Sequence, residues 1–313
     1  MNNRPLMVVG GLVVVLALLG TAFISAFRHP LPPPTAASGT MLVVGAENEY
    51  ASVLAQIGGP YVHAVGIMSN PNVDPHTFEA STVDASEVAK ASLVVQNGLG
   101  YDGFMQDLEA SSPNPRRIVL TAADIVGAPA GTPNPHLWYR PGTMQAVAGQ
   151  IARALGRLDP ARRGYFLGRL LAFDRSLGPW QQAIRQLRAT SRGTKVATVE
   201  PVADDLLQAA GLDIATPWTF QAAVMNGQDP SPQDVATVES LIAGRKVAAL
   251  VYNYQAVEPV TAALLALAKR HGVPVVGVYE TMPAGYDYQR WMLAETNALR
   301  LAIREHKSEV LVP

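Results

Sequence analysis

The sequence predicts an α/β fold of two lobes with parallel sheets, joined by a long connecting helix, with a ligand cleft between the lobes. In both halves of the chain, short apolar runs of strand length alternate with helical segments. Such alternation indicates βαβ units on a parallel sheet. Between the two halves lies a stretch that has helical spacing and no strand-like run.

The first lobe is assigned to residues 41–141. Its apolar runs of strand length lie at residues 41–45, 63–68, 93–96 and 117–120. Helices are expected between these runs, at residues 49–57, 83–91 and 104–110.

The connecting helix region is assigned to residues 142–192. Val147, Ile151 and Leu155 recur at helical spacing, so one face of this segment is apolar. A proline cannot continue a helix undisturbed. We therefore expect Pro160 to start or kink a helix and Pro179 to make a second interruption.

The second lobe is assigned to residues 193–313. Strand-length runs lie at residues 195–199, 247–252 and 273–279, and helices are expected at residues 202–210, 232–243, 259–270 and 288–303. Ser231 with Asp234 three residues later is typical of a helix start. Gly211 and Gly272 stand where helix C-caps are expected.

The N-terminus predicts export. Residues 6–27 carry no charge, and 22 residues match a membrane span of about 20 better than a secretory core of about 7–15. Residues 1–28 are therefore expected to be a signal peptide or a signal anchor; a buried core helix is disfavoured because the segment lies at the extreme N-terminus, before a linker. Residues 29–40 are rich in proline and small residues, which predicts a semi-rigid linker. The rest of the chain is expected in the periplasm or on the outer face of the cell membrane.

The composition excludes several classes of function. The chain has 24 Lys and Arg against 25 Asp and Glu, so it lacks the basic surface of a nucleic-acid-binding protein. It contains no cysteine, which removes disulfides, thiolate metal sites and cysteine nucleophiles. With 49% hydrophobic residues, it can bury a sizeable core.

Enzyme motifs are also missing from the sequence. It contains no phosphate-binding P-loop, no G-x-S-x-G nucleophile motif and no H-E-x-x-H zinc motif. Gly98, Gly100 and Gly103 match G-x-G-x-x-G after a strand, but no acidic residue follows at an evident second strand end. We therefore expect a binding protein without catalytic residues, rather than an enzyme.

Two histidines stand out from the other four. Those four occupy ordinary settings, in the linker, in a strand, before a capping glycine and in a charged tail: His29, His63, His271 and His306. His76 and His136 each follow a proline, which stiffens the backbone, and each lies after a strand run of the first lobe. A single histidine of this kind is more often structural, but the matched pair suggests ligands beyond the carboxyl ends of the strands.

The second lobe offers two carboxylates in equivalent places. Glu200 directly follows the run at residues 195–199, and Glu280 directly follows the run at residues 273–279. Each could be a helix cap or a surface acid, but a buried carboxylate must be paired or coordinated. Together with His76 and His136 they predict a four-residue site for one divalent cation, with two ligands from each lobe.

Five segments carry a resemblance to a known family: NVDPHTFE (72–79), VVQNGLG (94–100), NPHLW (134–138), TVEP (198–201) and VYET (278–281). Over about residues 42–303 the chain resembles the substrate-binding proteins of zinc/manganese ABC transporters, the cluster A-I metal-binding solute receptors. The resemblance implies two lobes bridged by a long helix, and His76, His136, Glu200 and Glu280 as ligands of one transported metal ion. It also implies an ABC permease with its ATPase subunit as partner.

The chain departs from that family in three ways. It has no cysteine for lipid modification, so an uncleaved N-terminal helix could tether it to the membrane. It has no histidine at residues 80–134, where zinc-specific members carry a histidine-rich loop. Asn134 stands where aspartate is common. Two imidazoles and two carboxylates favour Mn²⁺ or Fe²⁺ by coordination number, whereas raw affinity favours Zn²⁺; the sequence leaves Mn²⁺ and Zn²⁺ open.

Two further residues are expected beside the site. Asn253 ends a strand run and is a candidate to hydrogen-bond a ligand, because asparagine is rarely buried unpaired. Trp138 follows His136 closely and either walls the cleft or packs in the core. The sequence predicts a monomeric receptor that captures a divalent metal ion for import. A metal-dependent hydrolase and a metal-stabilised surface adhesin are the alternatives.

Overall fold

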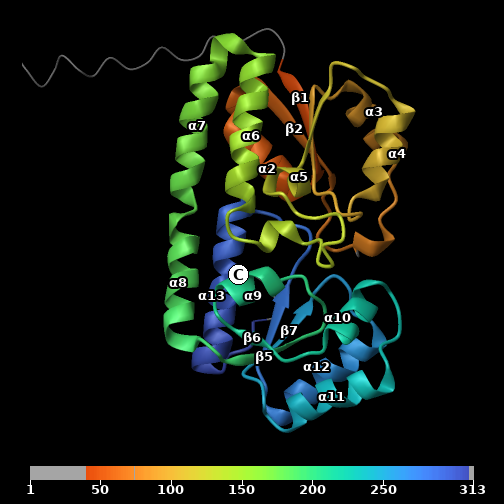
Figure 1. Cartoon of the computed structure of the whole chain (residues 1–313), viewed down its shortest axis with the longest axis vertical. Coiled ribbons are helices and arrows are strands. Elements are labelled where there is room, and N and C mark those ends of the chain that lie inside the picture. The colour runs from red at the N-terminus through yellow and green to blue at the C-terminus, as the bar shows by residue number, and fades with distance from the viewer. Residues whose placement is uncertain (1–39, 74, 310–313) are drawn as a thin grey trace, which may run out of the picture. The chain divides into compact units, whose positions relative to one another are not determined.

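Two four-stranded parallel sheets form the framework of the protein in the computed structural model (Figure 1). The structure describes residues 40–73 and 75–309, which belong to one compact unit. The predicted signal segment at residues 1–28 and residues 29–39 of the linker lie outside the described residues. Within the described residues, the two sheets and their flanking helices confirm the predicted fold class.

The first sheet has the strand order β2-β1-β3-β4. Its strands and helices follow one another in the order β1 (Met41–Glu47), α2 (Asn48–Gly58), β2 (Val62–Met68), α3 (Thr82–Lys90), β3 (Leu93–Gln96), α4 (Gly103–Ser111), β4 (Ile118–Thr121) and α5 (Ala122–Val126). Val43 and Val44 of β1 point to opposite faces and are both fully buried. Helices therefore cover both faces of this sheet, as the apolar runs predict.

The second sheet repeats the arrangement with the order β6-β5-β7-β8. Its elements are β5 (Lys195–Thr198), α9 (Asp204–Ala209), β6 (Asp213–Ile214), α10 (Trp218–Met225), α11 (Pro232–Ala243), β7 (Leu250–Asn253), α12 (Pro259–His271), β8 (Val275–Val278) and α13 (Tyr288–Glu305). Strand β6 is absent from the sequence prediction, because a two-residue strand leaves no apolar run to detect. Helix α10 is absent from the prediction as well.

Two helices of this lobe begin or end at capping residues that the sequence predicts. The Ser231 side chain accepts a hydrogen bond from the backbone N–H of Asp234 at 3.1 Å, which caps α11 as predicted. Gly272 ends α12 with φ of 66°, a conformation that costs glycine little. Both ends confirm what the sequence indicates.

The connecting region consists of three helices, α6 (Thr143–Leu158), α7 (Arg163–Ser176) and α8 (Gly178–Ser191). The chain turns between α6 and α7 at a short 3-10 turn that begins at Pro160, and Leu177 separates α7 from α8 just before Pro179. Helix α7 packs on α2 of the first lobe, and α8 packs on α13 of the second. The pair α7–α8 is thus the helical bridge between the lobes (Figure 1).

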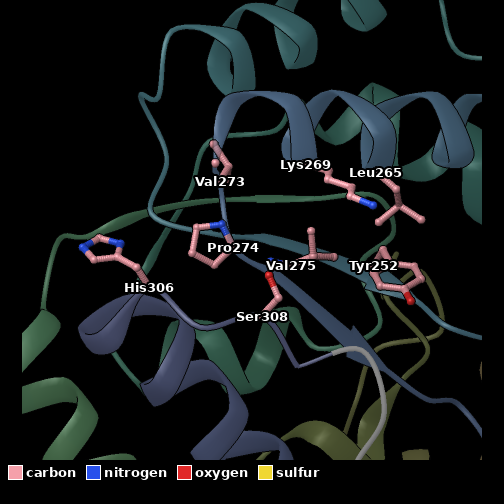
Figure 2. A pocket seen from close by; sticks show the side chains of 9 residues that line it. Tyr252, Leu265, Lys269, Val273, Pro274, Val275, His306 and Ser308 are labelled. Carbon is pink, nitrogen blue, oxygen red and sulfur yellow. Dashed lines mark hydrogen bonds between the residues drawn. The ribbon is translucent and has the colours of Figure 1, made fainter.

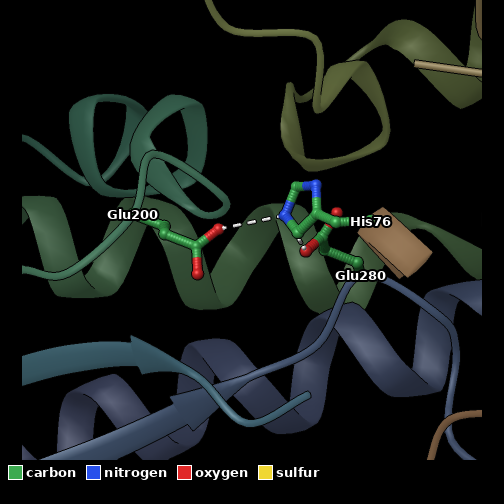
Figure 3. A group of neighbouring side chains, drawn as sticks. All are labelled: His76, Glu200 and Glu280. Carbon is green, nitrogen blue, oxygen red and sulfur yellow. Dashed lines mark ion pairs between the residues drawn. The ribbon is translucent and has the colours of Figure 1, made fainter. Parts of the chain in front are cut away.

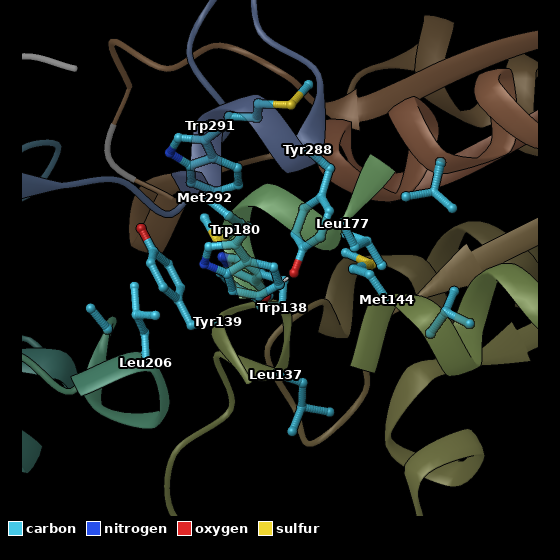
Figure 4. Close-up of a cluster of buried hydrophobic side chains, with 14 of the residues drawn as sticks. Leu137, Trp138, Tyr139, Met144, Leu177, Trp180, Leu206, Tyr288, Trp291 and Met292 are labelled. Atoms are coloured by element: carbon cyan, nitrogen blue, oxygen red, sulfur yellow. Dashed lines mark hydrogen bonds between the residues drawn. The ribbon is translucent and has the colours of Figure 1, made fainter. Parts of the chain in front are cut away.

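One hydrophobic core runs through both lobes. Figure 4 shows large aromatic side chains from the connecting and C-terminal helices gathered around the turn at Leu137–Tyr139. The Tyr288 hydroxyl donates to the Trp138 carbonyl at 2.6 Å, and the Trp180 indole donates to the Thr296 hydroxyl at 3.0 Å. This aromatic seam joins the lobes behind the candidate site.

Candidate metal centre

The four predicted ligands lie in loops that follow strands of the two sheets. His76 lies in a short 3-10 turn after β2, and His136 directly precedes the turn after α5. Glu200 and Glu280 each follow a strand of the second sheet, β5 and β8, by two residues. Because all strands within a sheet are parallel, these loops emerge at equivalent sheet edges.

The structure brings all four side chains together. The Nε2 atom of His76 lies 3.5 Å from Oε2 of Glu200 and 3.5 Å from Oε1 of Glu280 (Figure 3). Ligand-type atoms of these three residues lie within 4.8 Å of one another. His136 joins them through Glu280, with its Nε2 atom 3.2 Å from Oε2.

Asn134 sets the tautomer of the His136 ring. Its Oδ1 atom accepts from the backbone N–H of His136 at 3.1 Å and lies 2.7 Å from the ring Nδ1, while its Nδ2 atom donates to the Pro201 carbonyl at 2.9 Å. This orientation of the amide places a proton on Nδ1. In the neutral ring, the Nε2 lone pair then points at the Glu280 carboxylate. Two lone pairs face each other, so this position calls for a proton or a metal ion.

Glu280 is fully buried, and both of its carboxylate oxygens accept hydrogen bonds. Asn253 donates to its Oε1 atom at 2.5 Å and the Tyr101 hydroxyl donates to Oε2 at 2.8 Å. Burial acts to raise the pKa of Glu280, but the hydrogen bond and charge of His136 outweigh it and hold the pKa below its ordinary value. Glu280 is therefore an ionised carboxylate held in a fixed orientation.

Glu200 is buried without such support. It is 4% exposed, and neither carboxylate oxygen has a hydrogen-bond partner among the described residues. Burial raises its pKa, against the effect of the nearby His76 ring. Leaving a buried polar group unpaired costs about 1–3 kcal/mol, and more for a charge. An incoming cation would satisfy both oxygens at once.

Solvent reaches the cluster past His76, whose side chain is 32% exposed. Two pockets of about 420 and 410 Å³ flank this ring, and both are also lined by Met225 and Asn226. Glu200 lines the second of these pockets. A small ion can therefore reach the ligand atoms from the side of His76, while His136 and Glu280 close the opposite side.

The pocket in Figure 2 lies elsewhere in the second lobe, beside α12 and the start of β8, and measures about 480 Å³. Its titratable lining groups are Tyr252, Lys269 and His306, and its described lining includes no carboxylate. This chemistry does not suit a cation, so the candidate metal centre is the cluster at Glu200 and Glu280.

The glycine-rich loop after β3 does not provide a nucleotide site. The Asp102 carboxylate accepts hydrogen bonds from the backbone N–H groups of Asn97 at 2.5 Å and Gly98 at 2.9 Å. These amides are therefore unavailable to a phosphate. The loop instead carries Tyr101 to Glu280, a contact that sequence reasoning missed because the two residues are 179 positions apart.

Both residues expected beside the site are close to it. Asn253 binds Glu280 as described above, and Trp138 stacks edge-on against His136 with ring centroids 5.3 Å apart. Trp138 is fully buried, so it both packs in the core and walls the ligand cluster.

Gln255, which the sequence prediction did not include, donates from Nε2 to the Val73 carbonyl in the loop that carries His76.

The donor set suits a divalent cation. Two imidazole nitrogens and up to four carboxylate oxygens allow four to six bonds, and two ionised glutamates supply a charge of −2. A two-lobed α/β protein with such a cluster between its lobes has the architecture of a metal-binding solute receptor.

The comparisons with known proteins agree. Residues 43–302 match the family described as zinc-uptake complex component A, periplasmic, and the chain belongs to this family. The predicted resemblance to the zinc/manganese-binding solute receptors is thereby confirmed.

Two curated relatives are similar in sequence. The zinc-binding protein TroA of Treponema pallidum is 22% identical over 245 residues, which cover 76% of this chain and 78% of TroA. The manganese-binding lipoprotein MntA of Bacillus subtilis is 30% identical over 103 residues, or 31% of this chain and 33% of MntA.

Solved structures share the fold. The solute-binding protein FpvC of Pseudomonas aeruginosa, in complex with Mn²⁺, gives a TM-score of 0.70 at 21% identity and covers 85% of this chain and 99% of its own. The TroA structure also gives 0.70, at 20% identity, with 86% and 100% covered. Among residues 40–73 and 75–309, no helix has the length and apolarity needed to cross a bilayer.

Proposed function

We propose that this protein is an extracytoplasmic receptor for one divalent metal ion, which is Mn²⁺, Zn²⁺ or Fe²⁺. It delivers the ion to an ABC permease with its ATPase subunit. The observation that carries the proposal is that two neighbouring groups both call for a positive charge: the buried Glu200 carboxylate, which accepts no hydrogen bond among the described residues and faces His76, and the His136 ring, whose Nε2 atom faces Glu280. A positive charge between the groups would stabilise both arrangements.

His76, His136, Glu200 and Glu280 are the proposed ligands, and the metal ion is the cargo rather than a resident cofactor. Asn253 and Trp138 support them from behind. One chain supplies the whole set, so a monomer is sufficient. Binding without chemistry is the proposed mechanism, and residues 1–28 are proposed to tether the protein or to be removed on export.

The relatives support this assignment over the alternatives. The names of TroA and MntA describe zinc and manganese binding, and FpvC was solved with Mn²⁺. The hydrolase alternative is not favoured, because a hydrolase needs an open coordination position and a separate general base. The adhesin alternative is not favoured by the curated relatives, whose names describe metal binding.

Thermal unfolding of the metal-stripped full chain tests the proposal. The protein, purified in mild detergent, is titrated with Mn²⁺, Zn²⁺ and Fe²⁺. An ion at 100 times its Kd stabilises the native state by about 2.7 kcal/mol, or roughly 5–10 °C for a chain of this size. We expect one or more ions to give this shift, and the largest shift names the preferred cargo.

His76→Ala and Glu280→Ala are the matched test variants, and His63→Ala is the control because this histidine lies exposed in β2. The control should keep the full shift and the test variants should lose it. Protons compete with the metal for the ligands, so affinity should also fall between pH 7 and pH 5. A parent protein that no ion stabilises would contradict the proposal.

A further inference from the structure

Gln255, in the loop between β7 and α12, contacts both lobes. Its Oε1 atom accepts hydrogen bonds from the backbone N–H groups of Glu280 at 2.7 Å and Thr281 at 2.8 Å. Its Nε2 atom donates to the Val73 carbonyl at 2.9 Å. One side-chain amide thus ties the end of β8 in the second lobe to the loop of His76 in the first.

The same residue is locked to the carboxylate of Glu280. The backbone N–H of Gln255 donates to Oδ1 of Asn253 at 3.0 Å, and Nδ2 of Asn253 donates to the Glu280 carboxylate. Asn253, Gln255 and Glu280 therefore form a closed ring of hydrogen bonds. The side chain and the backbone of Glu280 are thus both linked to Gln255.

The link to the first lobe is the weak part of this ring. The Val73 carbonyl belongs to a residue that is 41% exposed, and Gln255 is itself half-buried. Water competes for an exposed hydrogen bond, so its net contribution is small. A bond of this kind can form and break while the ring around Glu280 stays intact.

We propose that Gln255 is an interlobe latch, a positioning residue that couples occupancy of Glu280 to closure of the loop carrying His76. This inference rests on the proposed function. When an ion fixes Glu280, the ring fixes Gln255, and its amide holds the Val73 carbonyl so that His76 stays over the ion. When the latch opens, His76 leaves and the ion is exposed.

Two substitutions separate the latch from local support of Glu280. Gln255→Glu keeps an acceptor for the two backbone N–H groups but replaces the donor to Val73 with an oxygen that repels the carbonyl. Gln255→Met removes both functions. The added negative charge of Gln255→Glu attracts the metal, and this attraction by itself would slow release rather than speed it.

The matched control is Gln56→Leu. Gln56 of α2 and Gln289 of α13 form an amide pair with bonds of 3.1 and 2.8 Å, which also bridges distant parts of the chain but contacts none of the four ligands in the described structure. Loss of this pair should leave metal release unchanged.

The experiment measures the release of Zn²⁺ and Mn²⁺ from the full chain into excess chelator by stopped flow. We expect Gln255→Glu and Gln255→Met to release metal about three- to tenfold faster than the parent, with similar association rates. The absence of native cysteine permits spin labels at Val83→Cys and Glu239→Cys, both exposed, one in each lobe. Both Gln255 variants should show a second, longer distance with metal bound.

Faster release by Gln255→Met alone, or unchanged release and label distances in both variants, overturns the latch. Failure of the parent protein to bind metal is a separate result, seen before any variant is tested, and it overturns the proposed function together with the latch.

Discussion

Glu200 and Glu280 are the same residue type at equivalent ends of strands in one sheet, yet their surroundings are opposite. Glu280 accepts hydrogen bonds from Asn253 and Tyr101 and contacts His136, whereas the Glu200 oxygens have no hydrogen-bond partner among the described residues. The pKa of Glu280 is lowered, by contacts that outweigh burial, and that of Glu200 is raised by burial. The site therefore has a preorganised half and an adaptable half.

The difference indicates how such a site can combine affinity with release. A carboxylate held by several donors gives a fixed ligand that loses little entropy on binding. A carboxylate that accepts no hydrogen bond has none to give up for the metal, so metal binding relieves part of the free-energy cost of its burial. The ion would be oriented by His136 and Glu280 and enclosed by His76 and Glu200.

The largest expected effect is the loss of binding in Glu280→Ala. This change removes a ligand and leaves Asn253 and Tyr101 facing a cavity, so metal affinity should fall by more than about 100-fold, beyond the 10–100-fold typical of supporting residues. Isothermal titration with Mn²⁺ and Zn²⁺ measures it. If Glu280→Ala lost less metal affinity than Glu200→Ala, Glu200 rather than Glu280 would be the dominant ligand.

Glu200→Gln should change both metal affinity and the stability of the metal-free protein. Metal affinity falls, but the metal-free protein becomes more stable at neutral pH, because an uncharged amide no longer pays the cost of a buried carboxylate. A folded-state pKa that is raised means that the parent loses stability as pH rises above about 4.5. The advantage of the variant should therefore be absent near pH 4.5 and grow toward pH 8.

Thermal unfolding of the two proteins without metal checks this prediction, with an expected rise of about 2–4 °C per kcal/mol gained. Glu280→Gln is the control with opposite sign, since its pKa is lowered and ionisation stabilises the folded state. Equal responses of the two variants would mean that the halves do not differ.

Asn134 tests the support of the preorganised half. Asn134→Ala frees the His136 ring from its fixed tautomer and should weaken metal binding about 10-fold. Asn134→Asp keeps the acceptor for Nδ1 and should retain most of the affinity, although it loses the bond to the Pro201 carbonyl. Equilibrium competition with a chromophoric chelator measures both; a loss as great in the aspartate variant would contradict the tautomer argument.

The smallest effect on binding is expected at Glu295, which lies behind Glu280. It is fully buried and accepts hydrogen bonds from Tyr139 at 2.5 Å and Trp291 at 2.6 Å, and burial raises its pKa to about 8. Its neutral form stabilises the fold below about pH 4.5, and this contribution is lost as pH rises through 8.

Glu295→Gln should thus flatten the fall in melting temperature between pH 5 and pH 9 while metal affinity at pH 7 changes less than threefold. Glu239→Gln, on the exposed face of α11, is the control and should reproduce the parent profile. A large loss of metal affinity in Glu295→Gln would mean that Glu280 is not held by its own contacts.

The sequence predicts the part of the site that depends on strand ends. His76, His136, Glu200 and Glu280 could be selected because each follows a strand, or a proline after one, and parallel sheets align such positions. Asn253 was found for the same reason. These residues need only the topology, which the alternating apolar runs reveal.

The supporting contacts could not be predicted because they depend on how the lobes are packed. Tyr101 meets Glu280 across 179 positions and Gln255 meets Val73 across 182, and no local pattern records such distances. Asn134 was treated as a departure from aspartate, whereas the structure uses both ends of its amide. In the fold, β6 was missed because it spans only two residues.

The bridge α7–α8 has the length to amplify a small bend. Helix α8 has 14 residues, which makes it about 21 Å long at 1.5 Å per residue. A bend of roughly 10° at its start, beside Leu177, would carry its far end through about 4 Å. Metal–ligand bonds are only about 2.0–2.6 Å long. A bend this slight, transmitted through α13 to the second lobe, would therefore displace that lobe by more than the length of a metal–ligand bond.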